Sequence, residues 1–324
     1  MLENLIATLK ADPRKIVFTE GPDPRILEAA SRLKQDGILE SILVGKVDEV
    51  QAAAKAGGFD IEGLEILDPA TCPEMDAMVA KMVELRKGKM TEEDCRKALS
   101  KGNYFGTMLV KIGKADALLG GATYSTADTV RPALQLIKTK PGNKIVSSCF
   151  ILTRTNADGK EENYAMGDCA INITPNEDEL VEIAIETAHT AKAFGIDPKV
   201  AMLSYSTMGS GKGDSVDMMR GATAKARAAA PDLAIDGELQ FDAAFSPVVA
   251  KTKCKDSPVA GQANTFIFPD INAGNIGYKI AQRLGGFEAF GPILQGLNAP
   301  INDLSRGCNA DEVYKMAIIT AGLK

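Results

Sequence analysis

Ser305 and Arg306 are the adjacent residues whose types most directly suggest chemistry. A hydroxyl beside a guanidinium fork suits the clustered oxygens of a phosphoryl group. Asp311 and Glu312 follow at the start of a predicted helix, where a carboxylate can serve as a general base. The same spacing fits a purely structural interpretation, in which Asn309 and Glu312 form a capping box and Asp311 opposes the helix dipole. The spacing leaves both interpretations open.

A glycine-rich segment, SYSTMGSGKGDS at Ser204–Ser215, is the second candidate. A dinucleotide-binding fingerprint needs its third glycine where Asp214 stands, and a Walker A loop needs a glycine where Ser206 stands. The segment is therefore either a strand-to-helix turn or a loop whose amides, with Lys212, meet an anion at the helix start.

Histidine and cysteine usage narrows the chemistry further. His189 is the one histidine and the six cysteines form no CxxC pair, so neither a metal cluster nor a Ser–His pair can be proposed. We therefore expect any general acid or general base to be a carboxylate. Cys308 lies close to Arg306, which would favour a reactive thiol, but with no nearby histidine to activate it we predict a packed residue.

Composition excludes several classes of function. The 324 residues are 45% hydrophobic and 25% charged, as in globular proteins, and the net charge of −6 argues against nucleic acid or a membrane surface as partner. No stretch approaches a membrane span, the first residues do not resemble a signal peptide, and the scattered cysteines indicate a reduced compartment. We expect a soluble, cytoplasmic protein.

Short apolar runs alternate with helical patterns along the whole chain. Strands are predicted at Lys15–Thr19, Ser41–Val44, Ala115–Leu119, Lys144–Leu152, Val200–Tyr205, Ala234–Leu239 and Thr265–Phe268. Helices are predicted from Asp23-Pro24 to Gly37 and over Val47–Ala56, Ala127–Lys138 and Glu177–Phe194. This alternation predicts an α/β fold with mostly parallel sheets, whose ligands meet the carboxyl ends of the strands.

Five segments together resemble the phosphate acetyltransferase (phosphotransacetylase) family. They are GGATYSTADTVRPALQ, SYSTMGSGKGDS, DGELQFDAA, NTFIFPDINAGNIGYKIAQRL and NDLSRGCNADEVYKMAIITA, in the family's order and spacing. The resemblance implies reversible acetyl transfer, acetyl-CoA + phosphate ⇌ CoA + acetyl phosphate.

The resemblance also implies an architecture. It is that of the isocitrate and isopropylmalate dehydrogenases: two α/β/α domains with the active site in the interdomain cleft. We expect residues 1–146 and 297–324 to form the first domain and residues 147–296 the second. A homodimer is the family's usual assembly, and acetyl phosphate links the reaction to an acetate kinase.

The family's motifs assign roles to individual residues. Ser305 and Arg306 match the pair that holds the acyl phosphate, and Arg131 (TVRPALQ) and Arg86 (ELRKGK) match further substrate-binding arginines. Glu312 stands where the family has an aspartate base. Since the family's Glu-Asp order is reversed here, Asp311 is the alternative base. CoA-binding candidates lie in the loop segments: Ser125, Thr126, Ser206, Gly209, Gly211, Asn275 and Tyr278.

The expected mechanism needs no tightly bound cofactor and no metal. The CoA thiol is itself the nucleophile, and a carboxylate takes its proton in a ternary complex. Two alternatives remain: an enzyme for a longer acyl group, resembling phosphate butyryltransferase, and a regulatory homologue that binds CoA or acyl phosphate without turnover.

Overall fold

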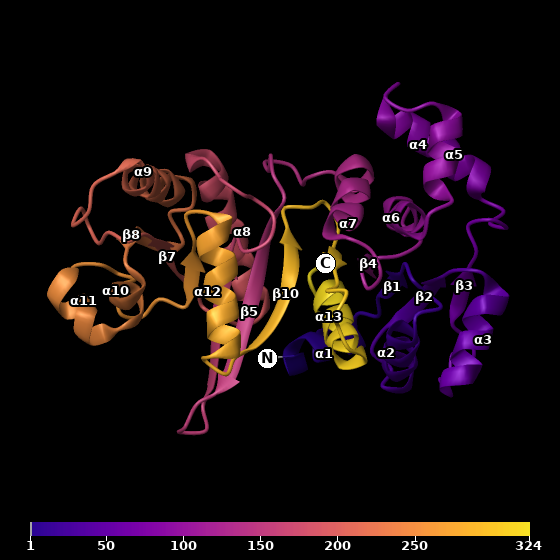
Figure 1. Ribbon diagram of the computed structural model, residues 1–324, viewed down its shortest axis with the longest axis horizontal. Helices are drawn as coiled ribbons and strands as arrows, with labels where there is room; N and C mark the ends of the chain where they lie inside the picture. Colours follow the sequence, from indigo (N-terminus) through magenta and orange to yellow (C-terminus); the bar gives the residue numbers. More distant parts are fainter. Residues whose placement is uncertain (1) are drawn as a thin grey trace. The chain divides into compact units, whose positions relative to one another are not determined.

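The computed structural model describes residues 2–324 of the chain. It divides into two compact units (Figure 1): unit 1 comprises Met1–Pro141 and Leu297–Lys324, and unit 2 comprises Gly142–Gly296.

Unit 1 is built on a five-stranded parallel sheet in the order β11-β4-β1-β2-β3. The strands are β1 (Lys15–Phe18), β2 (Glu40–Val44), β3 (Glu65–Leu67), β4 (Ala117–Gly120) and β11 (Ile301–Asp303). The central strands are buried on both faces, so their sequences are apolar runs rather than alternating ones. Because the strands are parallel, their carboxyl ends share one edge, and the loops after β1, β4 and β11 meet there.

Helices cover both faces of this sheet. On one face lie α1 (Leu2–Ala11), α2 (Pro24–Gln35) and α13 (Ala310–Gly322), so the two ends of the chain pack together (Figure 1). On the other lie α6 (Gly102–Lys111) and α7 (Thr126–Pro132), with α4 (Met75–Arg86) and α5 (Glu92–Leu99) packed outside them. Helix α3 (Val47–Gly57) contacts α2 and β3.

Local sequence signals account for several of these boundaries. The Asp23 side chain caps α2 by accepting a hydrogen bond from the Arg25 amide at 2.9 Å, and Pro24 takes the first helical position. The structure therefore confirms the helix predicted from Asp23-Pro24. It also confirms the predicted strands at β1, β2 and β4 to within about two residues at either end.

The helix predicted over Ala127–Lys138 differs from the observed one. Helix α7 ends at Pro132, and a π-helical turn follows over Ala133–Ile137, in which the Lys138 amide donates to the Ala133 carbonyl at 2.9 Å. Pro132 lacks the amide that would continue the α-helical ladder, which explains the change of winding.

Unit 2 contains a six-stranded mixed sheet in the order β10-β5-β6-β9-β7-β8. The strands are β5 (Ser147–Thr155), β6 (Glu161–Gly167), β7 (Lys199–Leu203), β8 (Ala234–Leu239), β9 (Thr265–Ile267) and β10 (Glu288–Gln295). The four on the β6 side are parallel, whereas β5 pairs antiparallel with both β6 and β10. Strand β5 corresponds to the strand predicted at Lys144–Leu152, whereas β6 and β10 had no counterpart in the sequence prediction. The β5–β6 hairpin turns at Asp158-Gly159, where Gly159 has a φ of +75°.

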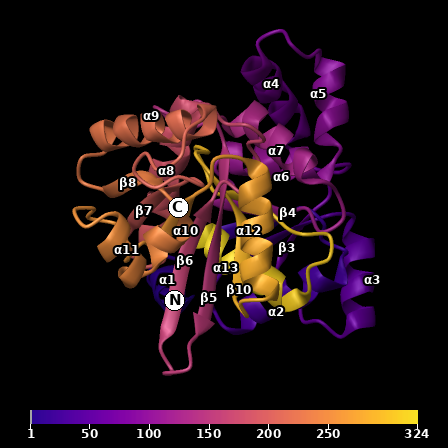
Figure 2. The same cartoon turned by 60° about the vertical axis from the view of Figure 1, so that its left-hand side comes forward.

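Two helices, α8 (Glu177–Ala193) and α9 (Asp214–Ala229), cover one face of this sheet. On the other, α12 (Ile271–Arg283) lies across β5, β6 and β10, and α10 (Phe241–Phe245) lies against β7 beside α11 (Pro247–Lys253) (Figure 2). His189 is exposed on α8, with its Nδ1 3.7 Å from a Glu186 oxygen. Over residues 2–324, no helix is long and apolar enough to span a bilayer.

Candidate functional site

Ser305 and Arg306 lie in the exposed turn between β11 and α13, at the carboxyl edge of the unit 1 sheet. The Ser305 hydroxyl accepts a hydrogen bond from the Gly307 amide at 3.3 Å. The Arg306 guanidinium makes no ion pair or hydrogen bond with residues 2–324. Its charge nevertheless acts to lower the pKa of Asp303. Both groups therefore face outward and are available to an anion.

Arg25 holds this turn in place through hydrogen bonds to its backbone. Its guanidinium donates to the carbonyl of Arg306 at 2.9 Å, to that of Cys308 at 3.2 Å and to that of Ala122 at 2.9 Å, while Asp23 neutralises it at 2.7 Å. One side chain at the start of α2 thus ties the loop after β4 to the turn after β11. This orients the Ser305–Arg306 backbone.

Cys308 is buried, and the Arg25 Nη1 lies 3.7 Å from its sulfur. Burial raises the pKa of the Cys308 thiol, and the nearby guanidinium opposes that only in part. The thiol is therefore protonated near neutral pH, which agrees with a packed residue rather than a reactive one.

Glu312 and Asp311 make different contacts. The Glu312 carboxylate accepts from the Asn309 amide at 3.0 Å while the Asn309 side chain accepts from the Glu312 amide at 2.9 Å, which confirms the capping box. Asp311 pairs with Lys315 at 3.0 Å and Arg32 at 3.1 Å, and these hydrogen bonds lower its pKa. Of the two carboxylates, Glu312 is the one without a cationic partner in the described residues.

Arg131 and Arg86 are the other two candidate anion-binding arginines of unit 1. Arg131 lies on exposed α7, 3.5 Å from Asp128, and Arg86 ends α4. Burial raises the pKa of Tyr104, whereas the charges of Arg131 and Arg86 oppose this rise. The Arg86 Nε is buried and has no hydrogen-bond partner within residues 2–324. A buried unpaired donor of this kind is costly, and a bound anion would satisfy it.

Ser125 and Thr126 stand at the start of α7: Ser125 is the N-cap residue and Thr126 the first helical residue. The Ser125 hydroxyl donates to Asp128 at 2.7 Å, and the Thr126 hydroxyl donates to the buried carboxylate of Asp303 at 2.6 Å. Both hydroxyls are therefore engaged within the protein, and the bond from Thr126 places α7 directly against the end of β11.

In unit 2 the glycine-rich segment is held by a buried carboxylate, Glu238, at the end of β8. It accepts from the Ser206 hydroxyl at 2.8 Å and the Gly209 amide at 2.7 Å, and Ser206 in turn accepts from the Gly211 amide at 2.8 Å. These bonds outweigh burial and lower the pKa of Glu238. The amides of Gly209 and Gly211 are thus already satisfied, whereas the exposed Lys212 side chain remains available to an anion.

A cavity of about 460 Å³ adjoins this loop, lined in part by Lys212, Arg220 and Met208. Arg220 is paired with Asp217 and Glu238, each at 3.3 Å, while the exposed Lys212 makes no ion pair with the residues that the structure describes.

Asn275 and Tyr278 lie on a different element, α12. The Asn275 side chain donates to the Cys169 carbonyl at 3.0 Å, and the Tyr278 ring stacks on Phe150 at a centroid distance of 3.9 Å. Both side chains make contacts that hold α12 on the sheet.

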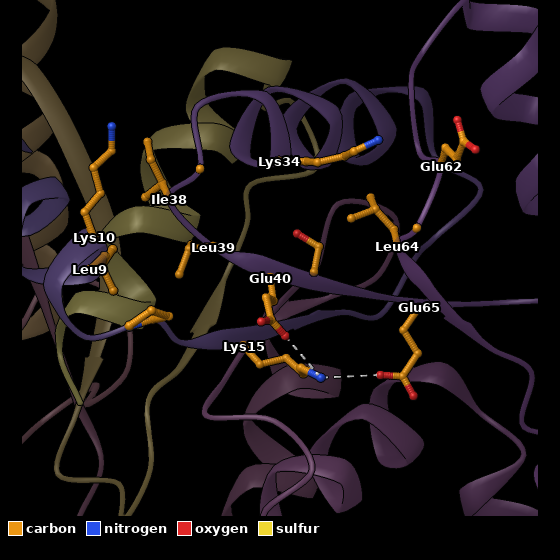
Figure 3. A pocket seen from close by; sticks show the side chains of 14 residues that line it. Leu9, Lys10, Lys15, Lys34, Ile38, Leu39, Glu40, Glu62, Leu64 and Glu65 are labelled. Atoms are coloured by element: carbon orange, nitrogen blue, oxygen red, sulfur yellow. Dashed lines mark ion pairs between the residues drawn. The ribbon is translucent and has the colours of Figure 1, made fainter.

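A larger cavity, of about 770 Å³, lies at the other edge of the unit 1 sheet, around the first residues of β1, β2 and β3. Figure 3 shows Lys15 between Glu40 and Glu65. The Lys15 Nζ forms ion pairs with the Glu40 carboxylate at 3.3 Å and with the Glu65 carboxylate at 3.7 Å. None of the candidate residues lines this cavity. Ligands of parallel sheets bind at carboxyl ends, so this cavity is not the candidate site.

Sequence reasoning missed four groups at the carboxyl edges: Glu20, Arg25, Asp303 and Glu238. Glu20 follows β1 directly and Asp303 ends β11. Their position after a strand was the available signal, but nothing in the local pattern indicated that these carboxylates would be buried.

Comparisons with known proteins identify the family of the chain. The family model described as phosphate acetyl/butaryl transferase matches residues 1–321. The phosphate acetyltransferase of Bacillus subtilis is 58% identical over 307 residues, which cover 95% of this chain and 94% of that protein.

Solved structures give the same result. A phosphotransacetylase from Streptococcus pyogenes superposes with a TM-score of 0.96 at 56% identity, covering 99% of this chain and 96% of that one. A putative 4-hydroxythreonine-4-phosphate dehydrogenase from Salmonella typhimurium, at 14% identity and a TM-score of 0.54, covers 96% of this chain and 100% of that one and shares the fold alone. The predicted dehydrogenase-like α/β class is therefore confirmed. The chain belongs to the phosphate acetyl/butaryl transferase family and is an acyltransferase.

Proposed function

We propose that this acyltransferase moves an acetyl group reversibly between acetyl phosphate and CoA, without a tightly bound cofactor or metal. The observation that carries the site assignment is the exposed, unpaired guanidinium of Arg306 beside Ser305, with Arg131 and the buried unpaired Nε of Arg86 also at unit 1. In a chain of net charge −6, such local cations select small anions.

The chemistry proceeds by direct attack. Glu312 takes the proton of the CoA thiol as the sulfur forms its bond to the acetyl carbon. Arg306 and the Ser305 hydroxyl stabilise the negative charge that develops on the acetyl oxygen. The bond between the acetyl carbon and the phosphate oxygen then breaks, and the phosphate leaves while Arg131 and Arg86 neutralise its charge.

Glu312 fits the base better than Asp311 does. The ion pairs of Asp311 with Lys315 and Arg32 lower its pKa and occupy its oxygens, which makes it a weaker proton acceptor. Glu312 accepts one backbone hydrogen bond through a single oxygen, and the other oxygen is left to accept a proton.

For CoA we propose the glycine-rich loop of unit 2, with Lys212 as the cation beside the 460 Å³ cavity. Acetyl phosphate would be shared with an acetate kinase, and we place the reaction in the cytoplasm.

The test follows loss of the CoA thiol with purified protein, given acetyl phosphate or butyryl phosphate. Turnover that clearly favours acetyl phosphate is expected. A preference for butyryl phosphate would instead assign a longer acyl group. CoA binding without turnover would indicate a regulatory homologue.

We also propose a homodimer that forms through α12. Ile276, Ile280 and Leu284 follow one another at helical spacing and are 58%, 52% and 86% exposed. Ile173, whose carbonyl accepts from the Ile271 amide at the start of the same helix, is 70% exposed. A contiguous apolar stripe of this kind is unusual on a monomer and is typical of an interface between copies.

Sedimentation measures this directly. The unaltered chain should sediment at twice its own mass, and Ile280→Asp with Leu284→Asp at the mass of one chain. Val248→Asp on α11, at a position 75% exposed, is the matched control and should leave the dimer intact. A monomeric unaltered chain would reject this proposal.

A further inference from the structure

A buried carboxylate, Asp303, and a half-buried one, Glu20, flank the loop that follows β4. Strand β4 lies between β1 and β11 in the sheet, Glu20 follows β1, and Asp303 ends β11. Asp303 is 2% exposed, and Glu20 is half-buried. Burial raises the pKa of both carboxyls, and their hydrogen bonds oppose that rise. Neither carboxylate forms an ion pair in the described chain, so each needs another reason to be buried.

Glu20 holds the first half of the loop. It accepts from the Gly121 amide at 3.2 Å and from the amide and hydroxyl of Thr123 at 2.7 and 3.0 Å. The Thr19 hydroxyl donates to Glu20 at 3.0 Å and meets the Tyr124 hydroxyl at 2.6 Å. The loop is thereby fixed to the end of β1.

Asp303 holds the second half. It accepts a hydrogen bond from the Thr126 hydroxyl at 2.6 Å and another from the Thr129 hydroxyl at 2.5 Å. One carboxylate thus binds two residues that lie one turn apart on the inner side of α7. Arg131 lies two residues beyond Thr129, and Ser305–Arg306 begin two residues beyond Asp303. The bond between Thr129 and Asp303 therefore links the two segments that carry the candidate anion-binding arginines.

Tyr124 connects the two halves. Burial raises its pKa, as do the charges of Glu20 and Asp303, while the hydroxyls of Thr19 and Thr129 oppose that rise. Its hydroxyl contacts the Thr19 hydroxyl, which in turn donates to Glu20.

The two glycines that end β4 make room for this arrangement. A Cβ at Gly120 would stand 2.1 Å from the Thr19 Oγ1 and 2.2 Å from the Tyr124 hydroxyl, and one at Gly121 would stand 2.2 Å from an Asp303 oxygen. The side chains of Thr19, Tyr124 and Asp303 therefore account for glycine at both positions.

We propose that Glu20 and Asp303 are positioning residues that fix α7, and with it Arg131, relative to Ser305–Arg306. In this way they set the affinity of the site for the phosphoryl group. This rests on the proposed function. A preorganised anion site loses affinity when its supporting bonds are removed, even though no group that touches the ligand has changed.

Thr129→Val is the sharpest test, because valine keeps the shape of threonine and removes the hydroxyl. The KM for acetyl phosphate and the Kd for inorganic phosphate, measured by calorimetry, should each rise about tenfold, the effect of one lost charge-assisted hydrogen bond. The KM for CoA should change less than about twofold. Thr129→Ser, which restores the hydroxyl, should bring both phosphate constants back toward those of the unaltered chain.

Thr223→Val is the matched control: Thr223 is also buried, and its hydroxyl donates to the Met219 carbonyl at 2.7 Å. It should lower Tm and leave both KM values unchanged. If Thr129→Val does not fold, Tyr124→Phe and Asp303→Asn must show the same selective loss.

Unchanged phosphate affinity in the folded variants, or an equal rise in both KM values, would overturn the positioning role. If the unaltered chain turned out not to use acetyl phosphate, the proposed function would fail, but phosphate binding across the Thr129 variants would still decide this inference.

Discussion

Asn309 and Glu312 exchange two hydrogen bonds at the start of α13, each side chain accepting from the other residue's amide at 3.0 and 2.9 Å. The residue proposed as the base is thus also the third residue of a capping box. The cap uses one carboxylate oxygen and holds the side chain in a single orientation, so the two roles are compatible.

Glu312→Gln separates these roles. Glutamine still serves in a capping box, so Tm should stay within about a degree, whereas loss of the proton acceptor should lower kcat by roughly 10²-fold or more. Steady-state kinetics and thermal unfolding give the two readouts. An active Glu312→Gln together with an inactive Asp311→Asn would move the base to Asp311.

The exposed arginines should matter for affinity and turnover but not for folding. Arg306→Ala and Arg131→Ala should each lower kcat/KM for acetyl phosphate at least about tenfold with an unchanged circular dichroism spectrum. Arg96→Ala is the control, since Arg96 is an exposed arginine paired with Asp76 at 2.8 Å. Near-normal turnover in either site variant would argue against the assigned site.

Asp311 should contribute a small, pH-dependent stability. Its pKa is lowered in the folded protein, so its contribution is present above the ordinary aspartate pKa and is lost as pH falls through the lowered one. Because the side chain is 52% exposed, Asp311→Asn should cost at most about 0.5 kcal/mol at pH 7. Urea unfolding at pH 7 and pH 2 measures this. A cost that grows on acidification would contradict the ion-pair assignment.

Cys308 should be dispensable for chemistry. Since it is buried with a raised pKa, Cys308→Ala should keep a substantial fraction of activity, and double-reciprocal plots should intersect, as a ternary complex requires. Parallel lines, or acetylated Cys308 found by mass spectrometry when CoA is omitted, would establish a covalent intermediate instead.

Gly121→Ala should destabilise unit 1. The φ of +98° and the clash of a Cβ with Asp303 together should cost about 2–4 kcal/mol in urea unfolding. Gly63→Ala isolates the backbone contribution, because Gly63 has a φ of +79° and nothing within 4 Å, and it should cost only about 1 kcal/mol. Equal costs would mean that the loop shifts freely away from Asp303.

Much of the fold could be predicted from the sequence, because the signals are local. Apolar runs and caps such as Asp23 predicted the α/β alternation and most strands, and the spacing of Asn309 and Glu312 predicted the capping box. Strand β5 was predicted, but its antiparallel partner β6 was missed because the short alternation of β6 resembles a loop between parallel units. The family motifs pointed to Ser305 and Arg306, and both lie exposed in the turn after β11.

Only the tertiary structure decided which polar groups support these residues. Thr126 and Asp303 are 177 residues apart, and Arg25 reaches Arg306 across 281. The sequence itself determined which residues could act and on which elements they stand. Whether a carboxylate meets water, a cation or a hydroxyl depends on which strands become neighbours, and packing across the whole sheet decides that. The free energy of a buried charge is set by its surroundings, and no local sequence pattern contains them.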